Sequence, residues 1–364
     1  MPHQPLIKNT WYVAGLSGEF APLALHGQIV AEKPVLLWRT QAGAMVAFDD
    51  RCVHKRMPLS AGRLIEGGLL ECAYHGLCYE ASGRCVRVPS HPDGHIPPGA
   101  QLRPLPLVEQ DGLVWVWPGD SEKASSVRPP RVPEMASADW DTADVGGAMA
   151  VPANSMLLIE NLLDITHFYP LHDGNIGDVE NSRIPVTMEE GTSEDGNRFV
   201  GTVRAVKGYS QPPYLAEYLG YDLVDRRHTH FMLSPALTRV QMRVWPAGRE
   251  GEAALERGYV IIHTHTPVDR RNHVWHLIVS MPKGQTCRSD PAKPAIAHFV
   301  ETFPKVIAED RWALERQQRM FELPDDGYVE VFLRPDAAVR RARTILNRME
   351  RAETGEPRKR TAAE

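Results

Sequence analysis

Two short pairs of cysteine and histidine constrain this chain more than any other feature. Cys52 and His54 form the first pair, and Cys72 and His75 form the second, with seventeen residues (55–71) between the pairs. Each pair combines a thiol with an imidazole. Two loop tips that face each other would bring the four side chains to one point, as in a metal centre.

Two kinds of metal centre use such a ligand set. A Rieske [2Fe–2S] cluster has two histidines in place of two cysteines, which raises its reduction potential because a neutral imidazole carries less negative charge than a thiolate. A structural zinc site is the alternative, but it usually groups its cysteines in one pair and its histidines in another. Both pairs are mixed here, which favours the Rieske cluster.

Composition and charge narrow the class of protein. The 364 residues, 43% hydrophobic and 24% charged, are enough for two globular domains. A net charge of -5 argues against a nucleic-acid-binding surface. No apolar run approaches a membrane span, and the N-terminus lacks the pattern of a secretion signal. Cys78, Cys85 and Cys287 are interpreted as free thiols in a reducing compartment. We therefore expect a cytoplasmic protein that binds neither nucleic acid nor membrane.

The residue pattern divides the chain into two parts and predicts an α+β fold. Short strand-like segments separated by Gly and Pro predict a small all-β domain over residues 1–120. Residues 121–145 are rich in Ser, Pro and Ala and are expected to form a linker. Residues 146–352 are expected to form a second domain with helices and a meander of antiparallel strands. The remaining residues, 353–364, are expected to be a disordered tail.

Three segments of the second domain are predicted to be helical. Residues 154–170 carry closely spaced apolar side chains that suit a buried helix, which Pro170 ends. Residues 294–321 are predicted to form a second, long helix, and residues 336–352 a third, charged one. Strand-like runs fill most of the sequence between the first and second helices.

A second cluster of possible metal ligands falls in the first of these helices. Asn161, Asp164 and His167 are three residues apart, so they would share one helical face, and His172 follows just beyond Pro170. Two histidines and one carboxylate form the facial triad of non-haem Fe(II) oxygenases. The alternative is a histidine pair that only caps a helix end. The polar face on an apolar helix and the cluster motif upstream favour the metal site.

The third ligand of this second site has to come from elsewhere in the chain. Asp164 is a poor candidate, because one turn before His167 its carboxylate is better placed to fix the tautomer of that ring. The predicted helix over residues 294–321 carries Glu309 and Asp310. Asp310 falls on the apolar stripe and Glu309 toward the outer face, and an acid on an apolar stripe is usually paired or functional. Asp310 is therefore predicted to be the third ligand.

These motifs resemble the oxygenase (alpha) component of Rieske non-haem iron aromatic-ring oxygenases. Cys-x-His with Cys-x-x-His, then Asn-x-x-Asp-x-x-His-x₄-His, then Glu-Asp on a late helix occur in the family's order and cover most of the chain. The chain length, the segment HTHTPVDRRNHVWHLI and the closing segment LRPDAAVRRARTILNRMERAE are similar, more narrowly, to the group of vanillate O-demethylase, dicamba monooxygenase and toluenesulfonate methyl-monooxygenase.

The resemblance implies a fold, cofactors and an assembly. The N-terminal domain would be a Rieske domain and the C-terminal domain a helix-grip (START/Bet v 1-like) catalytic domain with an antiparallel sheet. Each subunit would hold one [2Fe–2S] cluster and one mononuclear non-haem Fe(II). The subunits would form a head-to-tail homotrimer, in which Asp164 bridges His167 and either His54 or His75 of the next subunit. Asn161 would lie near the iron without being a normal ligand.

The implied reaction is the hydroxylation of an aromatic compound with O₂, most simply the O-demethylation or methyl hydroxylation of an aromatic acid. Nothing resembles a dinucleotide-binding GxGxxG motif, so electrons from NAD(P)H would come through a separate reductase carrying FMN or FAD and a 2Fe–2S centre, or through a reductase and a ferredoxin. Ring dioxygenation, or hydroxylation of another cyclic substrate, is the alternative reaction. A Rieske electron carrier without catalysis is the alternative of a different class.

The substrate contacts are the part that the sequence leaves open. By position, the resemblance assigns His263 a contact with the substrate. For His228, His230, His263 and His265, an equal interpretation is strand histidines that meet solvent or each other. An acid group would need an anchor, and Arg204, Arg239, Arg243 and His263 are all candidates.

Overall fold

The chain folds into two compact units, and each is described here by itself. The computed structural model describes residues 4–193, 196–324 and 327–355. One unit spans Lys8–Pro129, and the other combines Met1–Ile7 with Pro130–Glu364. The first seven residues were expected in the N-terminal domain, but Ile7 packs into a hydrophobic cluster of the second unit and the amide of Leu6 donates a hydrogen bond to Glu350 (3.0 Å).

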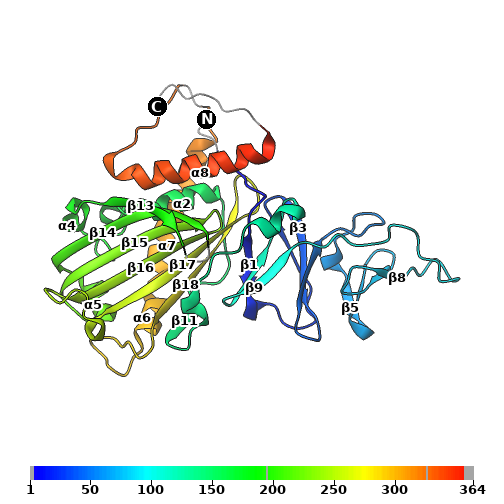
Figure 1. Ribbon diagram of the computed structural model, residues 1–364, viewed down its shortest axis with the longest axis horizontal. Coiled ribbons are helices and arrows are strands. Elements are labelled where there is room, and N and C mark those ends of the chain that lie inside the picture. The colour runs from blue at the N-terminus through cyan, green and yellow to red at the C-terminus, as the bar shows by residue number, and fades with distance from the viewer. Residues whose placement is uncertain (1–3, 194–195, 325–326, 356–364) are drawn as a thin grey trace. The chain divides into compact units, whose positions relative to one another are not determined.

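The first unit consists of three small antiparallel sheets, in agreement with the predicted all-β domain (Figure 1). The first sheet comprises β1 (Tyr12–Leu16), β10 (Leu113–Val116) and β9 (Leu107–Gln110). The second comprises β2 (His26–Val30), β3 (Lys33–Arg39) and β4 (Met45–Asp49), and the third β5 (Arg63–Ile65), β6 (Leu69–Glu71), β7 (Cys78–Tyr79) and β8 (Cys85–Arg87). Four short 3₁₀ helices join them: η1 (Ser17–Glu19), η2 (Leu59–Ala61), η3 (Glu66–Gly68) and η4 (Ser121–Ser126).

The first unit extends beyond the expected boundary at residue 120. The helix η4 follows that point, and the indole of Trp11 donates a hydrogen bond to the carbonyl of Val127 (2.8 Å). This contact ties the Ser- and Pro-rich segment to the β-structure rather than leaving it as a free linker.

The second unit is built on one large antiparallel sheet in which every strand pair runs antiparallel (Figure 1). The strand order is β11-β18-β17-β16-β15-β14-β13, and β12 also pairs with β18. The strands are β11 (Trp140–Asp144), β12 (Met149–Val151), β13 (Thr187–Thr192), β14 (Arg198–Ser210), β15 (Leu223–Ser234), β16 (Leu237–Pro246), β17 (Arg257–Pro267) and β18 (His273–Pro282). Residues 140–144 were expected in the linker, but they form β11 because the edge of β18 offers unpaired backbone groups.

Helices of the second unit pack on one face of this sheet, which gives the expected helix-grip arrangement. Contacts join α2 to β15 and β17, and α8 to β13 and β14. The helices are α1 (Pro133–Ala136), α2 (Ser155–Leu163), α3 (Phe168–Leu171), α4 (Val179–Arg183), α5 (Pro213–Leu219), α6 (Ala295–Thr302), α7 (Pro304–Phe321) and α8 (Ala337–Thr354), with 3₁₀ turns η5 (Ala253–Leu255) and η6 (Arg334–Asp336). The α+β fold class predicted from the sequence is confirmed.

Two of the predicted helices are broken in the structure. The segment 154–170 is helical only to Leu163, where Asp164 leaves the helical conformation (φ -94°, ψ 90°), and α3 starts at Phe168. The segment 294–321 is divided into α6 and α7 before Pro304, whose ring lacks the N–H that would continue α6. The predicted helix over 336–352 corresponds to α8, which continues to Thr354, and residues 356–364 of the expected tail lie outside the described residues.

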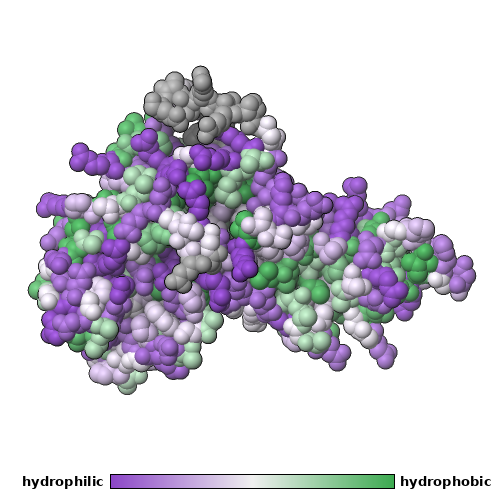
Figure 2. All heavy atoms as spheres, in the orientation of Figure 1, coloured by the Kyte–Doolittle hydropathy of each residue, from purple (hydrophilic) through white to green (hydrophobic). Residues whose placement is uncertain are grey.

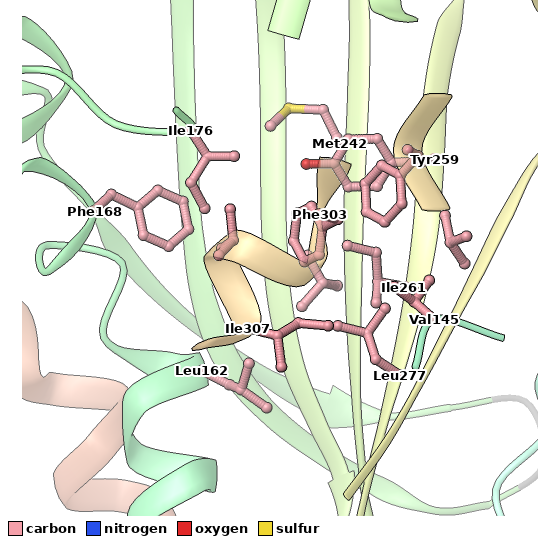
Figure 3. Close-up of a cluster of buried hydrophobic side chains, with 14 of the residues drawn as sticks. Val145, Leu162, Phe168, Ile176, Met242, Tyr259, Ile261, Leu277, Phe303 and Ile307 are labelled. Atoms are coloured by element: carbon pink, nitrogen blue, oxygen red, sulfur yellow. The ribbon is translucent and has the colours of Figure 1, made fainter. Parts of the chain in front are cut away.

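A hydrophobic core fills the space between the sheet and the helices of the second unit. Figure 3 shows Met242, Tyr259 and Ile261 from the strands facing Phe303 and Ile307 of the α6–α7 segment. Next to Phe168, polar side chains, among them Asp310, replace the apolar ones of the core. They line a cavity at the edge of the core.

The visible surface is mixed in character. In the view of Figure 2, hydrophilic residues cover much of the second unit and hydrophobic residues occur in small groups. None of the helices in the described part of the chain combines the length and the apolar character that crossing a membrane requires.

Candidate metal centres

The loops that carry the Cys/His pairs have the same backbone turn. The amide of Cys52 donates a hydrogen bond to the carbonyl of Met57, and the amide of Cys72 donates one to the carbonyl of Leu77, both at 2.9 Å. Each loop therefore closes five residues after its cysteine. The shared closure places the two cysteines at equivalent positions, although the two loops differ in sequence.

The same residue of each loop adopts a left-handed conformation. It is the fourth residue after the cysteine, Arg56 in the first loop (φ 56°) and Gly76 in the second (φ 70°). At Gly76 a Cβ atom would also approach Pro89 to within 2.9 Å, so glycine is required there for space as well as for conformation.

The four side chains form two separate pairs. Cys52 and Cys72 are buried in the core of the first unit, each 2% exposed, whereas His54 and His75 are exposed. The two Nδ1 atoms of the histidines are 3.1 Å apart. Burial, together with the adjacent Cys52, raises the pKa of the Cys72 thiol. A pair of thiols and a separate pair of imidazoles suit a centre with two metal ions, in which each pair binds one ion, better than a site for a single ion.

The second group of ligands converges from three places in the second unit. His167 lies just before α3, His172 just after it, and Asp310 lies on α7. His172 Nε2 is 3.1 Å and His167 Nε2 3.5 Å from Asp310 Oδ1. Among the described residues, these three form the only group of His, Cys, Asp or Glu whose ligand atoms all lie within 4.8 Å of one another.

Each histidine of this group is oriented through its Nδ1 atom. The Nδ1 of His167 bonds to the backbone carbonyl of Asp164, and the Nδ1 of His172 to the carboxylate of Glu309 at 2.8 Å. A carbonyl and a carboxylate can only accept, so each Nδ1 carries a proton. The Nε2 atoms face Asp310, and a metal ion that replaced the proton of His172 Nε2 would be bound through these atoms.

The ionisation of the three groups is linked. Burial lowers the pKa of His167. Burial also disfavours the charged form of His172, but its hydrogen bonds to Asp310 and Glu309 outweigh burial and raise its pKa. Burial opposes ionisation of Asp310 as well, but the hydrogen bond and the charge of His172 hold the pKa of this carboxyl below its usual value. The carboxylate thus stays charged between two imidazoles.

Glu309 has a role that differs from the sequence-based expectation. It was placed on the outer face of its helix, but its carboxylate contacts the buried His172 and lies within 3.4 Å of the amide of Asn175. Neighbouring positions on a helix are only about 100° apart, so a residue next to Asp310 can still reach the flank of the same site. This small angular separation was the one feature of the sequence that could have placed Glu309 near the site.

The two polar residues before His167 were expected to share one helical face with it. Only Asn161 lies on α2, and its amide donates a hydrogen bond to Asp310 Oδ1 (3.0 Å). Asp164 ends the helix, and its carboxylate accepts hydrogen bonds from the amide and hydroxyl of Thr166. The expected carboxylate contact with His167 is thus replaced by one from the Asp164 backbone.

A cavity lined mainly by apolar and aromatic side chains adjoins this group. His228, His230 and His263 also line it, and burial lowers the pKa of all three, that of His263 to about 3. The first two contact each other through their Nε2 atoms (2.9 Å), as one of the interpretations expected. His265 is not among the lining residues and bonds instead to Pro235 and Thr238.

The neutral His263 has a defined tautomer. Its Nδ1 accepts a hydrogen bond from the indole N–H of Trp275 (3.2 Å). A neutral imidazole carries a single proton, which must then reside on Nε2. His263 can therefore donate a hydrogen bond from Nε2.

Two protein families match the chain. The Rieske [2Fe-2S] domain matches residues 10–106, and the vanillate O-demethylase oxygenase C-terminal domain matches residues 151–352. The iron-sulfur subunit of a putative toluene-4-sulfonate monooxygenase system from Comamonas testosteroni is 30% identical over 96% of this chain and 99% of its own length. A vanillate O-demethylase oxygenase subunit from Pseudomonas sp. is 29% identical over 95% of both chains.

Solved structures give the same result. Dicamba monooxygenase bound to 3,6-dichlorosalicylic acid superposes with a TM-score of 0.84 at 25% identity, covering 97% of this chain and all of the other. Dicamba monooxygenase with non-heme iron and dicamba superposes with a TM-score of 0.77 at 25% identity, covering 98% and 99% of the two chains.

Fold, sequence and ligand geometry agree on one class of enzyme. The protein is an oxidoreductase with a Rieske [2Fe–2S] cluster and a mononuclear non-haem iron. It is the oxygenase component of a multicomponent system that depends on electrons from a reductase. The chain belongs to the vanillate O-demethylase family of Rieske non-haem iron monooxygenases.

Proposed function

We propose that this oxygenase hydroxylates a methyl or methoxy carbon of an aromatic acid. Its cluster ligands would be Cys52, His54, Cys72 and His75, and its mononuclear iron ligands His167, His172 and Asp310. When bound, the iron supplies O₂ activation and the cluster supplies electrons one at a time. The convergence of two oriented histidines and one carboxylate on an apolar cavity is the observation that carries this proposal.

The ligand geometry supports the assignment of both centres. Buried thiols paired apart from exposed imidazoles suit an all-sulfur iron and an imidazole-bound iron in one cluster. Two neutral-nitrogen ligands and one charged carboxylate at the second site leave positions free for O₂, as a facial triad requires. Asn161 would hold the Asp310 carboxylate in place without being a ligand itself.

The lining of the cavity supports an aromatic substrate, and the cavity itself, about 30 Å³, would have to widen to admit one. Phe168, Tyr259 and Phe303 are among its lining residues. Their rings, which Figure 3 shows within the hydrophobic cluster, would offer faces and edges to an aromatic group. His263 would donate a hydrogen bond from Nε2 to a polar substituent. The names of the relatives point the same way, because toluene-4-sulfonate, vanillate and dicamba are all aromatic acids.

The chemistry determines the products to be measured. One atom of O₂ enters the substrate, and the other leaves as water after two electrons and two protons are added. A hydroxylated methoxy group is a hemiacetal. The bond between its aryl oxygen and the former methyl carbon breaks, and the products are a phenol and formaldehyde. A hydroxylated methyl group remains as an alcohol.

The proposal includes an assembly and its partners. A head-to-tail homotrimer would allow the cluster of one subunit to reduce the iron of the next, with Asp164 in the path between them. Electrons would come from a reductase carrying a flavin and a 2Fe–2S centre, or through a ferredoxin. A cytoplasmic location is supported by the three cysteines that are not proposed cluster ligands, because Cys78, Cys85 and Cys287 are buried free thiols.

A substrate screen tests the proposed reaction. The holoenzyme is supplied with NADH and a surrogate reductase and offered aromatic acids and aromatic methyl ethers, and the products are identified by mass together with formaldehyde release. The gain of one oxygen, or the loss of a methyl group with formaldehyde, supports the proposal. A product that carries two new ring hydroxyls contradicts it and identifies a ring dioxygenase.

A further inference from the structure

Two arginines lie buried beside the cavity. Arg204 on β14 is 1% exposed and Arg226 on β15 is 2% exposed. In the register of the two strands, Arg204 is opposite His228, and Arg226 precedes His228 by two residues. All three side chains therefore project from the same face of the sheet. His228 lines the cavity and neither arginine does, so the arginine pair lies behind His228, next to the cavity wall.

Neither arginine has a carboxylate as a salt-bridge partner among the described residues. Both donate a hydrogen bond to one neutral acceptor, the side-chain oxygen of Asn181, at 2.9 Å and 2.8 Å. Arg204 Nε, Arg204 Nη2 and Arg226 Nε are buried without any hydrogen-bond partner. Two carboxylates lie near the pair, but Asp164 bonds to Thr166, and Asp178 accepts from the Tyr209 hydroxyl and the Asn181 backbone amide.

Other arginines of the same sheet are paired in the usual way. Arg239 bonds to Glu134 and Arg243 to Glu256, each at 2.5 Å. Both were candidates for binding an acid group of the substrate, but each guanidinium group already forms a salt bridge with a glutamate of the protein. Arg204 is the remaining arginine among these candidates.

The pair of buried charges is unfavourable as it stands. Burial, and after it the charge of Arg226, lowers the pKa of Arg204 to about 10, so the guanidinium is still charged at neutral pH. The ring of Tyr209, 4.1 Å from Arg226 Cζ, offsets part of the cost through a cation–π contact. Buried charges in proteins are generally neutralised by a partner, and here the unpaired N–H groups remain.

We propose that Arg204 and Arg226 bind the carboxylate or sulfonate group of the substrate. This inference rests on the proposed function, because it takes the cavity next to Asp310 as the place where an aromatic acid is oxidised. Guanidinium groups suit the task, since their planar forks match the oxygens of such anions and form charge-assisted hydrogen bonds. The acid group would lie on the side of the cavity formed by His228, next to the arginines, and the methyl or methoxy carbon would point toward the iron.

Binding measurements on the holoenzyme test the inference without relying on turnover. Benzoate and benzamide have the same shape, but only benzoate is charged. The wild-type protein should bind benzoate more tightly than benzamide. Arg204→Gln and Arg226→Gln should each weaken benzoate binding about 10- to 100-fold and leave benzamide binding unchanged. The control Arg243→Gln, on the same sheet and paired with Glu256, should change neither affinity.

Several outcomes would overturn the inference. One is equal affinity of the wild-type protein for benzoate and benzamide, which needs no variant and therefore no assumption about folding. Another is an Arg204→Gln protein that loses affinity for benzoate and benzamide equally, while its iron content and cluster spectrum are normal. A third is inorganic sulfate that stabilises the protein through Arg204 without competing with benzoate, because the pair would then hold a free anion rather than the substrate.

The same experiments separate this inference from the proposed function. If no aromatic acid is oxidised but benzoate affinity depends on both arginines, the reaction is wrong and the anion site stands. If aromatic acids are oxidised, and Arg204→Gln and Arg226→Gln bind and oxidise them as the wild-type protein does, the reaction stands and the anion site is wrong.

Discussion

Each imidazole beside Asp310 is held by an acceptor from a different part of the chain. The backbone carbonyl of Asp164 holds His167, and the side chain of Glu309 holds His172. A backbone acceptor cannot be removed by a substitution, whereas a side-chain acceptor can. The two histidines therefore differ in how their orientation can be tested.

Removal of His167 should separate the two metal centres. His167→Ala removes one proposed ligand of the mononuclear iron and leaves the other unit untouched. We expect the visible spectrum of the Rieske cluster to persist, while the mononuclear iron content and substrate oxidation are lost. His298→Ala, a histidine on α6 that does not line the cavity, should retain both metals. Full turnover by His167→Ala would refute the ligand assignment.

Removal of Glu309 should weaken the iron site through His172. Glu309→Ala leaves the Nδ1 proton of His172 without its acceptor, so the ring loses its fixed orientation and part of its basicity. We expect iron affinity, measured by competition with a chelator, to fall about 10- to 100-fold. Glu309→Gln keeps an acceptor and should lose less. Glu315→Gln on the same helix, whose carboxylate pairs with Arg311, is the control and should show wild-type affinity.

Asp310 and Glu309 differ in how much of their role could be predicted from their positions in the sequence. Asp310 could be identified because an acid on an apolar stripe is conspicuous in the sequence. Glu309 could not be assigned to His172, because its contact depends on where α3 ends and how α7 approaches it. The pairing of Arg204 with Arg226, rather than with an acid, depends in the same way on strand register.

At the scale of elements, the breaks in the helices decide the geometry of the iron site. The helix α2 ends at Leu163, and α3 is a separate turn, so His167 and His172 lie at the two ends of a four-residue helix. The sequence predicted one continuous helix because the apolar spacing continues to Ile165, and it contains no signal as strong as Pro304 for the break at Asp164. The strand content was easier to predict, since each strand has its own alternation and turn residues.

The helix α8 should contribute to the stability of the second unit. Its Leu346 is 2% exposed and belongs to a hydrophobic cluster with Met156, Ile159 and Leu163 of α2, the helix that carries Asn161. Leu346→Ala should lower the free energy of unfolding by about 2–5 kcal/mol, because it removes buried contacts and leaves a cavity. Arg348→Ala, at an exposed position two residues later, should change it by less than about 0.5 kcal/mol.

The helical circular dichroism signal provides the measurement for α8. All α-helices of the described chain lie in the second unit, so loss of this signal during chemical denaturation reports that unit alone. Equal midpoints and slopes for Leu346→Ala and the wild-type protein would show that α8 is not part of the cooperative unit.

At the scale of the whole molecule, the proposed ligands of the two metal centres belong to two different compact units. The sequence predicted both centres because most of the proposed ligands occur in short motifs, and Asp310 was added from its place on the apolar stripe of a later helix. The extent of each unit was harder to predict, because Ile7 and β11 join the second unit through contacts with residues more than a hundred positions away. The proposed head-to-tail trimer makes a specific prediction about how an electron passes from cluster to iron.

Two inactive variants should restore activity when they are assembled together. A His54→Ala subunit lacks a proposed cluster ligand but keeps the mononuclear site, and a His167→Ala subunit has the opposite defect. If the cluster of one subunit reduces the iron of its neighbour, a mixed trimer contains a single intact pair of centres. That pair is formed by the cluster of a His167→Ala subunit and the iron of a His54→Ala subunit. Coexpression with two different tags and tandem purification gives such trimers, which should regain up to about one third of the wild-type turnover because at most one of the three pairs is intact. Each variant purified alone should be inactive. Mixed trimers that stay as inactive as the single variants would show that each cluster serves the iron of its own subunit.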